Sequence, residues 1–271
     1  MELNDILSLK RPSLQQDHWL DEVRSWLPET HESHVDADGD IMAFTVTIGE
    51  PNATLYCCHL DTVHLSTGRQ TLGEDLWPGS LKTEDGECLG ADDGAGIWLL
   101  LEMMDAGTPG TYLFHLGEES GCIGSRWMAV HQRAWLKQFD RAISFDRPGT
   151  TDVITHLCGQ RSCSPGFALN VSLELSLYLP GYVLTPSDQG GSTDVRCYIG
   201  LIPECTNISI GYHRQHTRSE WLDVTYLMAL RDAMIAFGSS PLLTQERAQQ
   251  SDDPAPEEEV CGEEDELADC F

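Results

Sequence analysis

Histidines and acidic residues are gathered in five short motifs along the middle of the chain. In order, these motifs are His59-Leu-Asp61, Gly90-Ala-Asp92-Asp93, His115-Leu-Gly-Glu118-Glu119, Phe145-Asp146-Arg-Pro-Gly and His213-Arg-Gln-His216. Imidazole nitrogens and carboxylate oxygens are donors that suit Zn²⁺, with Co²⁺ or Mn²⁺ as substitutes. Two sets of such donors that share one carboxylate would hold two cations. The order of the motifs therefore predicts a site for two metal ions.

Each motif also has a simpler explanation when it is taken alone. Asp61 lies two residues after His59 on an extended segment, so it could orient the ring by accepting its hydrogen bond, or lie in a solvated turn. Asp92 precedes an apolar helix and could cap it instead of bridging two cations. The neighbouring acids Glu118 and Glu119 follow a buried strand, and their mutual repulsion raises one pKa unless cations neutralise them.

The last two motifs are equally ambiguous when they are taken alone. Asp146 closes a short apolar run and could begin a β-turn with the proline that follows. His213 and His216 are three residues apart, and both could be surface residues. Five independent coincidences are less probable than one shared site, which favours the metal interpretation.

The segments between the motifs alternate between strand and helix patterns. Apolar runs predict strands at 41–48, 53–59, 111–116, 141–145 and 207–211, and helical spacing predicts helices at 14–27, 95–104, 125–139, 167–177 and 220–237. This alternation predicts a single-domain, three-layer α/β/α fold around a central mixed, mostly parallel sheet, whose sites lie beyond the carboxyl ends of the strands. The polar, glycine-rich segment 65–90 is expected to form a long loop with a short hairpin.

Composition excludes several classes of function. The net charge of −28 argues against nucleic acid or an anionic membrane as a partner. No apolar run is long enough to span a bilayer, and the first residues lack a secretory signal, so we expect a cytoplasmic protein. Ten cysteines without a CxxC pair indicate reduced thiols.

Residues 1–240 are expected to form the catalytic domain, and the acidic, proline-containing segment 241–271 a disordered tail.

The amino-acid sequences of the motifs are similar to those of the co-catalytic di-zinc exopeptidases. HLDTV, GADDGAG, GEESG, SFDRPG and GYHRQHT occur in that order within residues 50–225. The resemblance includes aminoacylase- and carboxypeptidase-type enzymes, tripeptide aminopeptidases and bacterial leucyl aminopeptidases. It implies a zinc-dependent metallopeptidase, first of all an aminopeptidase-like exopeptidase. The alternatives are an N-acyl amino acid deacylase with the same site, and an inactive protein that binds peptides or zinc.

The resemblance also implies a role for each motif residue. Two Zn²⁺ ions would be held by His59, Asp92, Glu119, Asp146 and His216, with Asp92 as the bridge. Glu118 would be the general base for a zinc-activated water, and Asp61 would orient His59. The bond after Asp92 is expected to be cis, and the HTxxE context favours His216 over His213 as the last ligand.

The chain differs from the aminoacylase- and carboxypeptidase-type members of the group in the length of the segment between two motifs. Those relatives insert a lid or dimerisation domain on the order of 100 residues. Here about 45 residues separate Asp146 from Gly190-Gly-Ser-Thr-Asp194, which is too few for a domain. A short-form enzyme, expected to be a monomer, follows from this spacing. Asp194 is expected either to support the site or to belong to a plain turn.

Overall fold

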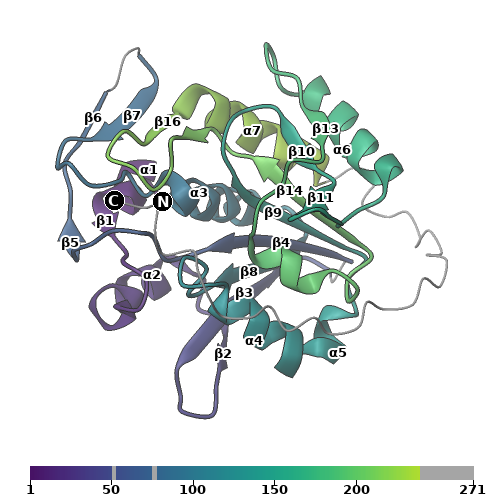
Figure 1. Cartoon of the computed structure of the whole chain (residues 1–271), viewed down its shortest axis with the longest axis horizontal. Helices are drawn as coiled ribbons and strands as arrows, with labels where there is room; N and C mark the ends of the chain where they lie inside the picture. The colour runs from purple at the N-terminus through teal and green to yellow at the C-terminus, as the bar shows by residue number, and fades with distance from the viewer. Residues whose placement is uncertain (51–52, 75–77, 239–271) are drawn as a thin grey trace.

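The computed structural model describes residues 1–50, 53–74 and 78–238, and its centre is a mixed sheet of eight strands (Figure 1). Their spatial order is β13-β10-β14-β9-β4-β8-β3-β2. Strands β14, β9, β4 and β8 are mutually parallel, β3 and β2 are added antiparallel at one side, and β10 is antiparallel to β14 and parallel to β13 at the other. The bounds are β2 Glu32–Val35, β3 Ile41–Ile48, β4 Thr54–His59, β8 Gly110–His115, β9 Arg141–Arg147, β10 Asp152–Ile154, β13 Thr185–Ser187 and β14 Glu204–Ser209.

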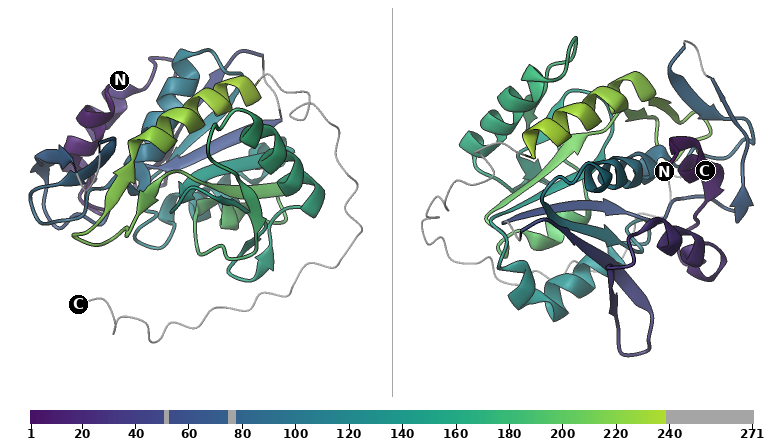
Figure 2. Two further views of the ribbon diagram at one scale, coloured as in Figure 1. Left: turned by 90° about the horizontal axis from the view of Figure 1, so that it is seen from above. Right: turned by 180° about the vertical axis from the view of Figure 1, so that it is seen from behind.

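Helices cover both faces of this sheet, with α3 and α7 on one face and α4 and α5 on the other (Figures 1 and 2). The first core also takes side chains from α1, α2 and α6, and the second from the 3-10 helix η2. Strand β4 shows the division, because Tyr56 and Cys58 pack in the first core while Leu55 and Cys57 pack in the second. The expected α/β/α layers are confirmed. The bounds are α1 Leu3–Ser8, η1 Gln16–His18, α2 Leu20–Trp26, α3 Ala91–Asp105, α4 Ile123–His131, α5 Arg133–Leu136, α6 Pro165–Leu177, η2 Asp194–Tyr198 and α7 Val224–Phe237.

A smaller antiparallel sheet holds two distant loops together beside α1. Its strands, in spatial order, are β15 Tyr212–His213, β16 Trp221–Asp223, β7 Ser80–Thr83 and β6 Leu72–Glu74. Strands β6 and β7 are the hairpin expected within 65–90. The described residues also form two short pairs, β1 Leu9–Lys10 with β5 Gly68–Arg69 and β11 His156–Leu157 with β12 Gln160–Arg161.

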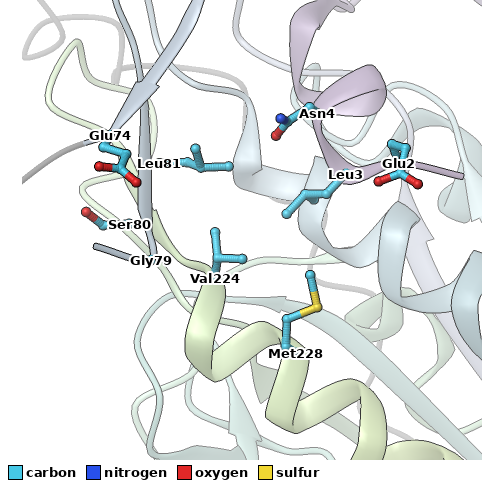
Figure 3. A pocket seen from close by; sticks show the side chains of 9 residues that line it. All are labelled: Glu2, Leu3, Asn4, Glu74, Gly79, Ser80, Leu81, Val224 and Met228. Atoms are coloured by element: carbon cyan, nitrogen blue, oxygen red, sulfur yellow. The ribbon is translucent and has the colours of Figure 1, made fainter. Parts of the chain in front are cut away.

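A cavity of about 270 Å³ remains where this smaller sheet meets α1 and α7 (Figure 3). Leu3, Leu81, Val224 and Met228 supply its apolar lining, and the acidic side chains of Glu2 and Glu74 lie at its ends. The cavity thus lies between the first residues of α7, strands β6 and β7, and the start of α1.

The boundaries of several expected elements needed correction. The expected strand 41–48 coincides with β3, and the helix 95–104 lies inside α3. The helix expected at 220–237 is wrong at its start, because Trp221 and Leu222 pair with β7. The side chain of Asp223 accepts a hydrogen bond from Tyr226 N at 2.9 Å and so caps α7, which begins at Val224.

Two other expected helices are shorter than their patterns suggested. The helix at 125–139 is divided at Gln132 into α4 and α5, and the one at 14–27 is replaced by η1 followed by α2. The eight cysteines of the described residues are free thiols. Within the same residues no helix is long and apolar enough to cross a membrane. The tail expected at 241–271 lies outside the described residues.

Candidate metal centre

The five sequence motifs meet at one edge of the central sheet. His59 ends β4, Glu118 follows β8, and Asp146 is the second-last residue of β9, so three neighbouring parallel strands bring them to the same edge. Asp92 is contributed by the start of α3, and His216 by the loop between β15 and β16. Three groups of donor atoms each lie within 4.8 Å of one another: His59, Glu118 and Glu119; His59, Asp92 and Asp146; and Asp92, Glu119 and His216.

The carboxylate of Asp92 lies between two histidine rings. His59 Nε2 is 3.1 Å from Asp92 Oδ1, and His216 Nε2 is 3.2 Å from Asp92 Oδ2. His59 Nε2 also lies 3.7 Å from Asp146 Oδ1, and His216 Nε2 lies 3.0 Å from Glu119 Oε1. Each ring therefore faces one oxygen of Asp92 and one further carboxylate, an arrangement in which Asp92 can be shared between two sites.

Asp61 acts on the site differently from the sequence-based expectation. The ring nitrogen His59 Nδ1 lies 3.0 Å from the backbone oxygen of Asp61, whereas the carboxylate is 3.8 Å away. That carboxylate instead accepts backbone N–H groups of the turn after β8, from Gly117 at 2.9 Å, Glu118 at 3.1 Å and Glu119 at 3.3 Å. A carbonyl can only accept, so Nδ1 carries a proton, and Nε2 is the ring nitrogen that can bind a metal ion.

The start of α3 is held by two further carboxylates. Glu220 accepts the backbone N–H of Asp92 on Oε1 and that of Gly90 on Oε2, both at 3.0 Å. Asp93 accepts the backbone N–H of His59 at 3.2 Å and of Gly96 at 3.1 Å. The bond between Asp92 and Asp93 is cis, as the resemblance implied. Glu220 is the last residue of the HTxxE motif, which was the only sequence signal for its part in the site.

Gly90 has a conformation that a larger residue would not adopt without strain. Its φ is +70°, and an added Cβ would lie 2.7 Å from His64 Cε1. Glycine at this position therefore lets the chain pass close to the β4 loop and turn into the segment that carries Asp92.

Asp146 is fixed by hydrogen bonds to neutral partners. Thr193 Oγ1 donates to its Oδ2 at 2.7 Å, and the Tyr212 hydroxyl donates to its Oδ1 at 2.9 Å. The backbone N–H of Asp146 donates to Asn207 Oδ1 at 2.9 Å. These three partners were not predicted, because they come from loops and strands that are distant in sequence.

Asp194 lies close to the site but does not enter it. Its Oδ2 is 3.0 Å from His115 Nδ1, and the other ring nitrogen of His115 is 2.5 Å from the hydroxyl of Tyr198. All three side chains are buried beneath the sheet edge. Within the glycine-rich stretch 190–194, Thr193 is therefore the residue that touches the cluster.

The two candidate histidines of the last motif have different surroundings. The ring of His213 stacks on Trp221 with centroids 4.1 Å apart and an interplanar angle of 11°. His216 has a φ of +62°, and its ring reaches Asp92 and Glu119. Of this pair, only His216 contributes to the donor groups found among the described residues.

The electrostatics of the cluster favour added positive charge. Burial, together with the nearby carboxylates, raises the pKa of Glu118 to about 9 and also raises the pKa of Glu119 and Asp146. Burial would lower the pKa of His216, but the carboxylates at its ring outweigh it and raise that pKa to about 11. Four carboxylates thus share a site that can keep them ionised only if cations or protons offset their charge.

The imidazole and carboxylate donors of the cluster are suited to binding a divalent metal ion. The oxygen Glu119 Oε1 is buried, and it faces His216 Nε2 at 3.0 Å. A carboxylate oxygen and an imidazole nitrogen that face each other at this distance can bind a common cation, which would replace the proton on the ring nitrogen. The cluster forms one wall of a cavity of about 350 Å³, whose other walls include Cys122, Arg147 and Gln215.

Comparison with known proteins agrees with this picture. Residues 42–164 match peptidase family M28. No protein with a curated description matches the sequence. Solved structures with a similar fold include the aminopeptidase PepT of Bacillus cereus ATCC 10987, at 12% identity and a TM-score of 0.67 over 90% of this chain and 97% of that one. A tripeptidase of Staphylococcus aureus subsp. aureus Mu50 gives 13% identity and a TM-score of 0.63 over 90% and 97%.

A third similar structure bears on oligomeric state. The TET1 peptidase of Pyrococcus horikoshii gives 14% identity and a TM-score of 0.62 over 87% of this chain and 98% of that one. TET1 can assemble into a tetrahedron or a large octahedral shell, so the comparisons lend no support to the expected monomer. The family match over residues 42–164 and the fold confirm the resemblance noted in the sequence, and they indicate a hydrolytic metallopeptidase similar to the co-catalytic zinc exopeptidases.

Proposed function

We propose that the protein is a two-zinc exopeptidase of the aminopeptidase type, which cleaves a peptide bond with water and uses Glu118 as the general base. The observation that carries this proposal is the Asp92 carboxylate between the rings of His59 and His216, at 3.1 and 3.2 Å. A carboxylate with one oxygen toward each ring suits the bridging position of a dinuclear site.

The proposed ligand sets follow the donor groups. His59, Asp92 and Asp146 would hold one cation, and Asp92, Glu119 and His216 would hold the other. Imidazole and carboxylate donors suit Zn²⁺, and Co²⁺ or Mn²⁺ would be accepted as substitutes. When bound, such cations supply Lewis acidity, which lowers the pKa of water and polarises a scissile carbonyl.

The chain itself supplies the proton transfer. Glu118 lies beside the ligands, and its backbone is held by Asp61 at 3.1 Å. We assign it to take a proton from the attacking water and return it to the leaving amine. Glu118 Oε1 lies 3.5 Å from Cys122 Sγ, which leaves its other oxygen for the water. Asp61 thereby supports both His59 and Glu118.

The test is metal analysis combined with a substrate panel of dipeptides, longer peptides and N-acyl amino acids. Glu118→Gln should abolish turnover and keep the metal content, whereas Glu29→Gln, at an exposed acid far from the cluster, should change neither. Near-normal activity of Glu118→Gln would contradict the assignment of the base. If the protein hydrolyses only the N-acyl amino acids, it is a deacylase. If metal-loaded protein cleaves none of the substrates, it is a binding protein.

A further inference from the structure

Arg147 supplies a permanent positive charge to the cavity of the metal cluster. It directly follows Asp146 at the end of β9 and lines the cavity of about 350 Å³ that contains the metal cluster. Of the described residues that line this cavity, Arg147 alone is an arginine or a lysine, and the others include four carboxylates of the cluster. A fixed positive charge beside these acids is suited to an anionic group of the substrate.

The guanidinium of Arg147 is held by one edge. Its Nε and Nη2 both donate to Asp152 Oδ2, at 3.1 and 2.8 Å. Asp152 is itself fixed, because Thr151 Oγ1 donates to its Oδ1 at 2.9 Å and its backbone N–H donates to Ser209 Oγ at 3.1 Å. Arg147 therefore has a set orientation although about one fifth of its side chain is exposed.

The other edge of the guanidinium is available for a ligand. A guanidinium carries five N–H donors, and the pair made by Nη1 and Nη2 matches the two oxygens of a carboxylate. Asp152 uses Nε and one hydrogen of Nη2, and among the described residues no hydrogen bond from Nη1 is found. The remaining edge can therefore bind a second carboxylate without displacing the first.

We propose that Arg147 binds the C-terminal carboxylate of a short peptide substrate, and this proposal rests on the function proposed above. The shared cavity limits the length of that substrate. Arg147 and the cluster residue Asp146 are consecutive and line the same cavity. A carboxylate at the arginine therefore belongs to a residue close in sequence to the bond at the cluster. The cavity is also at the small end of ligand pockets. The substrate class is thus dipeptides and tripeptides with a free C-terminus.

The experiment compares free acids with amides. Dialanine and trialanine are measured beside their C-terminal amides on metal-loaded wild-type protein, Arg147→Gln, Arg147→Lys and the exposed control Arg161→Gln. A hydrogen-bonded ion pair of this kind should favour the free acids by about 10- to 100-fold in kcat/KM. Arg147→Gln should lose this preference through a higher KM for the acids and keep its rate on the amides. Arg147→Lys should keep part of the preference, and Arg161→Gln all of it.

A binding measurement separates this proposal from the proposed hydrolysis. Calorimetric titration of Glu118→Gln, with and without Arg147→Gln, uses the same dialanine and its amide. If the acid binds more tightly than the amide and this difference depends on Arg147, the carboxylate site is supported. This holds even if the wild type cleaves neither peptide, a result that would contradict only the proposed hydrolysis. Equal cleavage and binding of acid and amide by the wild type, or an equal loss on both in Arg147→Gln, would overturn the carboxylate site. If a dipeptide amide whose last residue is aspartate binds as tightly as the free acid, Arg147 recognises an acidic side chain and not the C-terminal carboxylate.

Discussion

The carboxylate of Glu220 accepts the backbone N–H of Asp92 at 3.0 Å and so fixes the residue that lies between the two histidine rings of the cluster. Its second oxygen accepts the N–H of Gly90 at the same distance. Glu220 is 1% exposed, so these two bonds are made away from water. A residue that contacts no donor atom of the cluster thus sets the position of its central carboxylate.

Glu220→Ala should weaken metal binding and the fold together. The two buried N–H groups would lose their acceptor, at about 1–3 kcal/mol for each unsatisfied group. Because Asp92 would be less well held, the affinity for metal should fall by about 10- to 100-fold. Competition with a chelator and chemical unfolding measure the two effects. Glu220→Gln keeps one acceptor oxygen and should lie between the wild type and Glu220→Ala; an affinity for metal that is unchanged in both variants would exclude this role.

Asp61→Asn should reduce turnover more than metal binding. The ring of His59 is bonded to the backbone oxygen at this position, which the substitution keeps. One side-chain oxygen is replaced by an NH₂ group that cannot accept, so at least one of the N–H groups of Gly117, Glu118 and Glu119 loses its acceptor, and the turn that carries Glu118 should shift. We expect kcat to fall by about 10- to 100-fold. Steady-state kinetics with metal analysis would test this, and a variant with normal kcat but reduced metal content would contradict it.

His216→Ala and His213→Ala form a matched pair. Loss of His216 removes the ring beside Asp92 and Glu119, so the protein should retain about one metal ion less and lose most of its activity. Loss of His213 removes only the stacking on Trp221 and should leave metal content unchanged. Metal analysis of both purified variants decides between them. The assignment fails if His213→Ala loses metal and His216→Ala retains it.

Sequence patterns predicted the parts of the fold that short-range physics determines. The apolar run 41–48 is strand β3 because it is buried and has partners on both sides. The run that begins at Trp221 has the spacing of a helix, but Trp221 and Leu222 pair with β7 as a strand. The helix begins only at Val224, where Asp223 caps it. Tertiary contacts of this kind leave no local signal, so the helix was expected four residues too early.

The same distinction applies to the site. The side chains brought together at the cluster were found because each follows a strand end or opens a helix. The residues that hold them were missed, as Arg11 illustrates. This buried arginine donates to the backbone oxygens of Leu60 at 2.7 Å and Gly90 at 3.3 Å, and thus ties the N-terminal segment to two cluster loops. Nothing in the sequence around Arg11 indicates such a bond across 49 or 79 positions.

Glu87 should make part of the stability dependent on pH in the acid range. Burial would raise its pKa, but hydrogen bonds from Ser66 Oγ, Lys10 Nζ and Leu65 N outweigh it and lower the pKa from 4.5 to about 2. A carboxylate with a lowered pKa stabilises the fold above its unfolded value, and this contribution declines as the pH falls from about 4.5 toward about 2. Urea unfolding of the metal-free protein should therefore show Glu87→Gln to be less stable than wild type at pH 7, with a smaller difference at pH 4. Glu84→Gln, at an exposed acid nearby, should show no such difference. A gap between wild type and Glu87→Gln that stays constant or widens toward pH 4 would rule out the ionised pairing of Glu87 with Lys10.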